Sequence, residues 1–185
     1  MPILEREPSC YPDDLLNGFC RTASDRQWWA LYTKARHEKA VARYLAANSI
    51  PFYLPLVPQT SVSCHRRRTS HVPLFSGYVF VCARCDERTT VLMSNRISRI
   101  LDVGDDELLE MDLRQLSQLI VSGAPLTIEA RLGPGQRVRV RYGPLAGLEG
   151  TVLKRRDESR LLIGVSFLQQ GASVEIEDFQ VELIE

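Results

Sequence analysis

The chain has 185 residues, of which 44% are hydrophobic, and its 23 basic residues are balanced by 23 acidic ones. A net charge of zero excludes a long-range field that would draw the whole molecule onto nucleic acid or a membrane, so any nucleic-acid contact must come from a local patch. No stretch approaches the roughly 18 apolar residues that span a bilayer, and acidic residues stand where a secretion signal needs an apolar core, which predicts a soluble cytoplasmic protein.

The cysteines are odd in number and irregularly spaced, which is not typical of a secreted disulfide framework, so we expect them to be reduced. They are Cys10, Cys20, Cys64, Cys82 and Cys85. The last two form a C-x-x-C pair, which is half of a zinc site if Cys64, His65 or His71 complete it. A second closely spaced pair is missing, so we favour the alternative that Cys82 lies on an apolar strand, Cys85 lies in the next turn, and no metal or other cofactor is bound.

The first quarter of the chain contains one strand and one helix. Residues 1–26 are rich in proline, aspartate and arginine and lack periodicity, which predicts a loosely ordered extension. The aromatic and apolar run 28–32 has the length of a buried strand. A helix is predicted over 36–48, because apolar side chains recur at spacings of three and four, at Ala40, Val41, Tyr44 and Leu45. Pro51 prevents its continuation, and residues 52–57, which include a proline, predict an edge strand.

The next segment mixes strands and helices without the regular alternation of a parallel sheet. Residues 61–70 predict a polar loop that holds three successive arginines, and residues 74–81 form the strongest predicted strand. A short helix is expected over 86–94, a strand over 97–103 and a second helix over 112–121. The order predicts an α+β domain over 27–122, in which helices cover an antiparallel sheet.

The last third of the chain has a different character. Residues 123–132 lack a sustained pattern and predict an interdomain linker. From residue 133 to 185, valine, leucine and isoleucine alternate with polar residues, and turn signals such as Gly143–Pro144 separate the runs. About fifty residues of short strands predict a small SH3-like all-β barrel.

Two motifs carry a family resemblance. Residues 136–152 resemble the KOW motif, a strand, a tight turn and a returning strand with glycines at 143, 147 and 150 where a side chain would obstruct the bend or a close backbone approach. Residues 28–32 with the following helix, and then Pro73–Val81, resemble the N-terminal domain of NusG transcription factors. The resemblance covers residues 27–185 and includes features of the specialised RfaH-type paralogues. The alternating KOW pattern predicts a stable barrel and not the helical hairpin of a fold-switching paralogue.

The resemblance implies that the N-terminal domain regulates pausing, termination or antitermination by holding the clamp helices of the largest RNA polymerase subunit through an aromatic patch. Aromatic side chains suit this task, because they bury large rigid areas at low entropic cost. Carried over by motif, the patch comprises Tyr32, Phe75, Tyr78 and Phe80. Strand alternation places Tyr78 and Phe80 on one face and Val79 and Val81 on the other. The alternative is that some of the four aromatic residues belong to the core.

Two further surfaces follow from the resemblance. Contacts to phosphates of upstream or non-template DNA are expected from basic residues, namely Lys34, Arg36, Arg66, Arg67, Arg68, Arg96 and Arg99. For the three successive arginines, the alternative is a solvated hairpin tip. The KOW barrel implies a recruited partner, either ribosomal protein S10 or the termination factor Rho, through exposed loops at Leu145, Leu148, Phe167 and Leu168. Phe167 has a core alternative, and leucines replace the phenylalanines of typical NusG barrels, which leaves the partner open.

No catalytic constellation accompanies the histidines at positions 37, 65 and 71, and no glycine loop suits a phosphate, so we expect a monomer that is not an enzyme. A second hypothesis is a KOW-bearing RNA-binding or ribosome-associated module. It would use Arg137, Arg139 and Arg141 on phosphates. Its weakness is that the same domain carries a comparable number of acidic residues.

Overall fold

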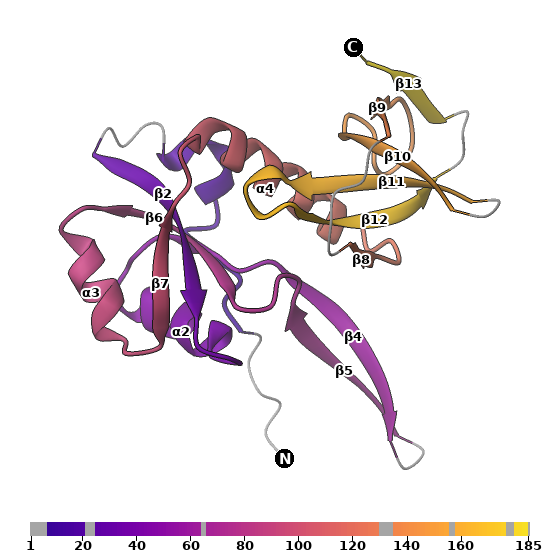
Figure 1. Cartoon of the computed structure of the whole chain (residues 1–185). Helices are drawn as coiled ribbons and strands as arrows, with labels where there is room; N and C mark the ends of the chain where they lie inside the picture. Colours follow the sequence, from indigo (N-terminus) through magenta and orange to yellow (C-terminus); the bar gives the residue numbers. More distant parts are fainter. Residues whose placement is uncertain are drawn as a thin grey trace. The chain divides into compact units, whose positions relative to one another are not determined.

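The computed structural model describes residues 7–20, 25–63, 66–129, 135–155, 158–176 and 180–184, and the side chains of 61–63, 66–68, 154–155 and 158 are not among the described parts. Contacts divide the chain into two compact units, residues 1–106 and 107–185 (Figure 1). The predicted fold class is confirmed, because an α+β unit with an antiparallel sheet is followed by a separate β-rich unit. No helix within the described ranges combines the length and apolar character needed to cross a membrane.

The first unit is built on a five-stranded antiparallel sheet in the order β1-β3-β6-β2-β7. Its elements are β1 (Cys10–Tyr11), the short helical segment η1 (Leu15–Phe19), β2 (Arg26–Thr33), α2 (Glu38–Ala47), β3 (Phe52–Tyr53), β4 (Leu56–Ser63), β5 (Arg66–Pro73), β6 (Tyr78–Arg84), α3 (Glu87–Met93) and β7 (Ile97–Asp102). The strand predicted at 28–32 and the helix predicted at 36–48 correspond to β2 and α2.

One face of this sheet packs on α2 and α3 to form the main hydrophobic core. Trp29 and Leu31 of β2 and Val79 and Val81 of β6 lie on this face. Their partners are Val41 and Leu45 from the predicted apolar side of α2, Ala42 of the same helix, and Val91 of α3. Alternation along each strand therefore leaves a second face, which carries Trp28, Tyr32, Tyr78 and Phe80.

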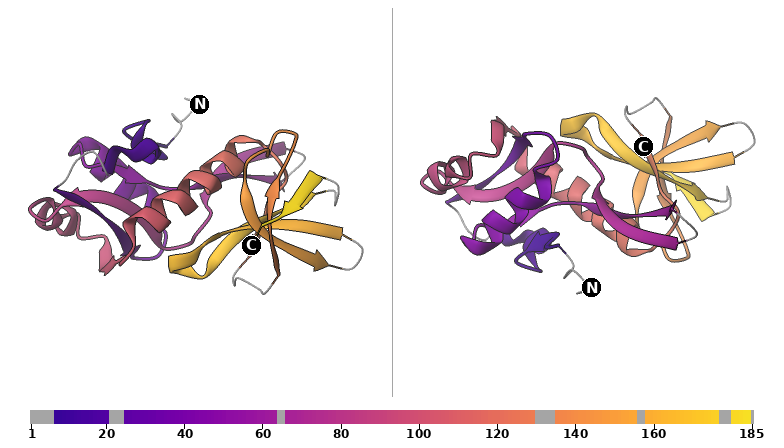
Figure 2. Two further views of the ribbon diagram at one scale, coloured as in Figure 1. Left: turned by 90° about the horizontal axis from the view of Figure 1, so that it is seen from above. Right: turned by 90° about the horizontal axis from the view of Figure 1, so that it is seen from below.

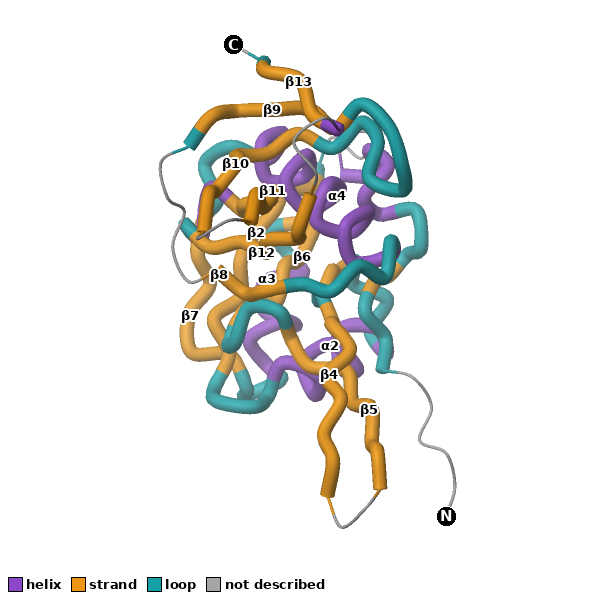
Figure 3. The backbone as a smooth tube through the Cα atoms, turned by 90° about the vertical axis from the view of Figure 1, so that its right-hand side faces the viewer, coloured by secondary structure: helices purple, strands orange, loops and turns teal. Residues whose placement is uncertain are grey.

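The polar loop predicted at 61–70 is wrong, because its described residues belong to a long hairpin. β4 and β5 pair in antiparallel register from Leu56–Pro73 to Ser63–Arg66, and they run side by side away from the sheet (Figures 1 and 3). Serine and threonine recur along both arms, and such residues are compatible with a strand exposed on both faces. The strand predicted over 74–81 starts later, at Tyr78, because residues Phe75 to Tyr78 form a turn.

The loosely ordered extension predicted for residues 1–26 is also wrong for its described part. β1 pairs with β3 at the edge of the sheet, and the amide of Leu54 donates to the carbonyl of Ser9 at 2.6 Å. Leu15 is completely buried and Leu16 nearly so. Figure 2 shows this indigo segment at the margin of the first unit in both views. A few apolar residues without periodicity are enough to hold this segment, because β3 offers a sheet edge with which β1 can pair.

The second unit is a six-stranded antiparallel sheet in the order β13-β9-β10-β11-β12-β8. Its elements are α4 (Asp106–Val121), β8 (Thr127–Glu129), β9 (Gln136–Val140), β10 (Glu149–Arg155), β11 (Glu158–Val165), the single turn η2 (Ser166–Leu168), β12 (Gln170–Ile176) and β13 (Val181–Leu183). The predicted alternation is visible in β9, where Val138 and Val140 are buried and Arg137 and Arg139 are exposed.

Helix α4 begins six residues before the predicted start at Asp112. Its polar side chains accept hydrogen bonds from backbone amides of this unit. The Asp112 carboxylate accepts from the amide of Ser166, and the Gln115 side chain accepts from the amide of Glu149, both at 2.7 Å. β8 lies inside the predicted linker 123–132 and pairs with β12. The two units defined by contacts, 1–106 and 107–185, therefore have other limits than the predicted domains, 27–122 and 133–185. Those domain limits stay a prediction.

Candidate functional site

The second face of the first sheet is organised in cross-strand rows. At one end Tyr78, Tyr32 and Arg99 stand opposite one another on β6, β2 and β7. In the middle row Tyr53, Phe80, Ala30 and Leu101 follow one another across β3, β6, β2 and β7. At the far end Trp28 stands opposite Cys82. Directly opposed side chains on one face contact each other, so each row acts as a unit.

The tyrosine row is the exposed end of this face. The rings of Tyr32 and Tyr78 lie 5.3 Å apart at a tilt of 55°, and Tyr32 is 43% exposed whereas Tyr78 is partly buried. Arg99 beside them is exposed. Two rigid rings with an adjacent cation provide a surface suited to a protein partner that offers apolar and acidic side chains.

A buried carboxylate and a glycine position the tyrosine row. The amide of Gly77 donates to Glu38 at 2.7 Å, and its carbonyl accepts from the amide of Thr33 at 2.8 Å. Gly77 has a φ of +85° as the third residue of the Phe75–Tyr78 turn, and a β-carbon there would lie 3.1 Å from the Tyr32 ring. Sequence reasoning missed Glu38, because a glutamate at a helix start is ordinarily exposed and near the positive end of the helix dipole.

Two of the four predicted polymerase-binding residues are not on the surface. Phe75 is 1% exposed and Phe80 is completely buried, with their rings edge to face at 6.4 Å. Their expected role as exposed contacts is therefore corrected to a core role. Alternation identified the face of Phe80, but it carries no information on what covers each part of that face. Tyr32 and Tyr78 are the two whose rings reach solvent.

The predicted DNA-contacting residues are placed in two groups. Lys34, Arg36 and Arg99 are exposed and Arg96 is partly exposed, on or beside the ends of β2 and β7 nearest the tyrosine row. The Lys34 ammonium donates to the carbonyl of Asn95 at 2.8 Å, which holds the two segments together. The side chains of Arg66, Arg67 and Arg68 lie outside the described parts, although their backbone forms the start of β5.

The predicted partner-binding residues of the second unit also fall into two groups, which differ in their burial. Leu145 and Leu148 are buried, so their expected exposure is wrong, and they serve the core below the turn. Phe167 and Leu168 are half-buried in η2. Exposed residues separate the two leucines of the turn. In the sequence this pattern is compatible both with a partner-binding loop and with leucines that anchor the turn in the core.

Cys20 and Cys82 form a disulfide, so the expectation that all cysteines are reduced is wrong for this pair. Cys82 lies on β6 and Cys85 in the turn beyond it, as the alternative reading expected, and Cys82 is not free to bind zinc. Within the described ranges no group of three histidine, cysteine or acidic residues can hold a metal ion. Cys64 and His65 lie outside those ranges. The 62-residue separation offers no local signal for such a pairing.

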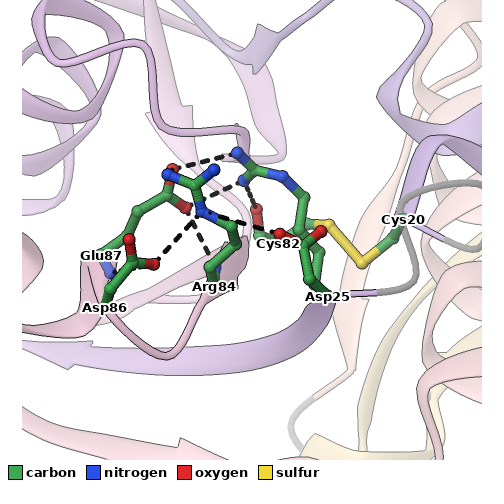
Figure 4. A network of polar contacts seen from close by, with 7 residues as sticks. Cys20, Asp25, Cys82, Arg84, Asp86 and Glu87 are labelled. Atoms are coloured by element: carbon green, nitrogen blue, oxygen red, sulfur yellow. Dashed lines mark hydrogen bonds and ion pairs between the residues drawn. A yellow bond between two sulfur atoms is a disulfide. The ribbon is translucent and has the colours of Figure 1, made fainter.

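An ion-pair network fixes the end of the second face that carries the disulfide. Arg26 donates both to the carbonyl of Cys82 and to Glu87, at 3.0 and 2.9 Å, and its side chain and that of Glu87 are largely buried. Arg84 contacts Asp25, Asp86 and Glu87 from the other side (Figure 4). Arginine forks suit this geometry, because two parallel hydrogen bonds can be made to one carboxylate. The network joins β2, β6 and the start of α3.

Cys10 is a second free thiol of the described residues, besides Cys85. Burial, and then the charges of Asp13 and Asp14, raise the pKa of Cys10 to about 11. Roughly one Cys10 in a thousand is then a thiolate at pH 8, and the thiolate is the reactive form.

We expect iodoacetamide to alkylate Cys10 about two orders of magnitude more slowly at pH 8 than it alkylates a cysteine in a short unstructured peptide. The rate should rise about tenfold per pH unit until about pH 11, because the neutral thiol is favoured below that pH. Mass spectrometry of the alkylated peptide measures this rate. A plateau near pH 9 would contradict the raised pKa.

Comparison with known proteins finds a matching family model and similar sequences. The sequence model of the NusG family, described as transcription termination factor nusG, matches residues 26–120. The chain is 28% identical over 179 residues to the transcription termination/antitermination protein NusG of Haemophilus influenzae, covering 88% of this chain and 97% of that protein. The NusG protein of Pseudomonas aeruginosa is 27% identical over 175 residues, covering 86% and 99%.

A crystal structure of the MjSpt4:Spt5 complex also matches, over 85% of this chain and 97% of that chain, with 15% identity and a TM-score of 0.28 that supports no argument. The family match is the decisive one. It spans more than half of the chain and runs from the first residue of β2 to the penultimate residue of α4, including the tyrosine row. The chain belongs to the NusG family of transcription factors.

Proposed function

We propose that this chain regulates transcript elongation by binding RNA polymerase through its first unit and recruiting a partner through its second. The observation that carries the proposal is the exposed Tyr32–Tyr78 row within the segment matched by the family model. The relatives bear the name of transcription termination/antitermination proteins, which supports a role in pausing, termination or antitermination.

The polymerase contact is proposed for the coiled-coil clamp helices of the largest subunit. Tyr32 is exposed and Tyr78 is partly exposed, and Arg99 beside them suits an acidic side chain on a helix. Phe75 and Phe80 support the row from within the core and do not touch the partner. Buried aromatic neighbours fix the rings above them, which lowers the entropic cost of binding.

Upstream or non-template DNA is proposed to meet the basic residues near the same end of the sheet. Lys34, Arg36 and Arg96 cluster around the β2 and β7 ends, and Arg66 to Arg68 begin β5, the returning arm of the hairpin. Such contacts neutralise phosphates without reading sequence. They would make binding depend on salt.

For the second unit, the proposal retains Phe167 and Leu168 as contacts for ribosomal protein S10 or Rho. Both are half-buried in η2 between β11 and β12, so part of each side chain is available to a partner. Leu145 and Leu148 are not part of this proposed surface, because they are buried.

A pull-down with core RNA polymerase tests the first contact. Tyr78→Ala in the full chain is expected to weaken binding by about 10- to 30-fold, because it removes one ring of the row and leaves Tyr32 without its neighbour. Tyr142→Ala is the matched control, since Tyr142 is an equally large, 50% exposed tyrosine of the second unit. Equal binding by the wild type and Tyr78→Ala would contradict the proposal.

The rival function, an RNA-binding or ribosome-associated module, would use the arginines on and directly after β9. Arg137, Arg139 and Arg141 are exposed, but Glu149 and Glu182 pair with them, three arginines against two glutamates. The hydrogen bond and the charge of Glu149 raise the pKa of Arg139. The pairing leaves little free positive charge for phosphates. Binding to ribosomal RNA without any affinity for polymerase would favour this rival.

A further inference from the structure

The N-terminal extension is attached covalently to the second face of the sheet, through Cys20 at the end of η1 and Cys82 on β6. We propose that this disulfide is a redox-modification site, which a dithiol reductant opens to release the extension from the sheet. The inference rests on the proposed function, because a transcription regulator works beside DNA in a reducing compartment. Disulfides are rare there, and those that occur are mostly transient or redox-sensing.

The disulfide lies next to the face proposed for polymerase. Cys82 stands opposite Trp28, and on β6 it is two residues from Phe80 and four from Tyr78, on the same side of the strand. Both sulfur-bearing residues are buried, as are Trp28 and Leu15. Opening the bond therefore changes the packing at the far end of the very face whose near end carries the tyrosine row.

The two cysteines are held with unequal strength by the rest of the unit. Cys82 is in the middle of the sheet, and its carbonyl accepts from Arg26, which Glu87 fixes in turn (Figure 4). Besides the disulfide, the contacts of the extension include a two-residue strand, the buried side chains of Leu15 and Leu16, and an ion pair between Glu7 and the exposed Arg43. Short strands and exposed ion pairs contribute little. Reduction removes the covalent attachment, so it should loosen the extension and leave β6 in place.

The proposed reaction is a thiol–disulfide exchange. A thiolate of the dithiol attacks one sulfur of the Cys20–Cys82 bond, which breaks, and a mixed disulfide forms while the other cysteine leaves as a thiolate and takes up a proton. The second thiol of the dithiol, as its thiolate, then attacks the dithiol's own sulfur in the mixed disulfide, which breaks that bond, releases the first cysteine as a thiolate that takes up a proton, and closes the dithiol into a cyclic disulfide. Two electrons and two protons pass to Cys20 and Cys82. Since both are buried, the extension must open locally before the first attack, so the opening limits the rate.

Hydrogen exchange of the full chain tests the site without polymerase. The probe is dithiothreitol, and the reporter is the amide of Leu54, which donates to Ser9 of the extension. In the reduced wild type and in Cys20→Ser, this amide is expected to exchange about tenfold faster or more than in the oxidised wild type. Amides in the β2–β6 ladder should keep their rates. Cys85→Ser is the matched control, because it removes an exposed free thiol and should behave as the oxidised wild type.

Unchanged Leu54 exchange on reduction and in Cys20→Ser would overturn the inference, because the disulfide would then be purely structural. A polymerase pull-down of the oxidised and reduced wild type separates this failure from that of the proposed function. Loss of binding in Tyr78→Ala with unchanged exchange overturns the redox site alone. Faster exchange with no polymerase binding in either state supports release of the extension and overturns the proposed function.

Discussion

Gly77→Val is expected to lower the free energy of unfolding of the first unit by about 3–5 kcal/mol and to abolish the defined geometry of the tyrosine row. A β-branched side chain is strained at the φ of +85° that Gly77 adopts, and its β-carbon would lie 3.1 Å from the Tyr32 ring. The glycine cannot shift easily, because Glu38 binds its amide and Thr33 binds its carbonyl. Denaturant unfolding followed by tryptophan fluorescence measures the loss, since Trp28 and Trp29 both lie in this unit.

A double-mutant cycle separates the two causes. In a Tyr32→Ala background the ring is gone, so Gly77→Val should retain its backbone strain and lose the part of its cost that comes from the clash. A coupling of about 1 kcal/mol or more is expected. Zero coupling would mean that the turn, and not the close approach of Tyr32, requires glycine at this position.

The sequence predicted those elements whose pattern is local. β2, α2 and β9 each show the period of their own secondary structure, and the turn signals at Pro51 and Gly143 mark real ends. Such patterns state which residues share a face. They do not state how much of that face is covered, which is why the aromatic patch predicted from the sequence includes both Tyr78 and Phe80, two residues apart on β6, although Phe80 is completely buried.

Features that depend on distant partners were not predicted. The Cys20–Cys82 bond joins positions 62 residues apart, and the extension pairs with β3, whose edge is distant in the sequence. Arg26 and Glu87 pair across 61 residues, and nothing in the neighbourhood of either residue indicates the other. Glu38 is buried for a similar reason, because its partner Gly77 lies on a separate turn. Each of these contacts is set by the assembled sheet.

Gly171 of the second unit is likewise constrained by a paired strand and not by its neighbours in the sequence. Gly171→Ala is expected to lower the free energy of unfolding of this unit by about 3–5 kcal/mol. A β-carbon at Gly171 would lie 2.3 Å from the carbonyl oxygen of Ile163 and 2.9 Å from the α-carbon of Gly164, both backbone atoms of the paired strand β11. Neither can retreat without breaking the β11–β12 ladder, and β8 pairs with Gly171 from the other side. Thermal unfolding followed by far-UV circular dichroism measures this loss, while the tryptophan signal of the first unit should stay unchanged.

Gly147→Ala provides the matched control, because the two substitutions add the same methyl group to the same sheet unit. Apart from Gly147 and its two chain neighbours, no heavy atom of the described residues lies within 4 Å of the added carbon, so its φ of +87° is what opposes the change, at a cost of about 1–2 kcal/mol. The difference between the two variants isolates the close backbone approach at Gly171. Equal losses would mean that β11 can move away from β12 at this point, and that the ladder tolerates a side chain where the structure leaves no space for one.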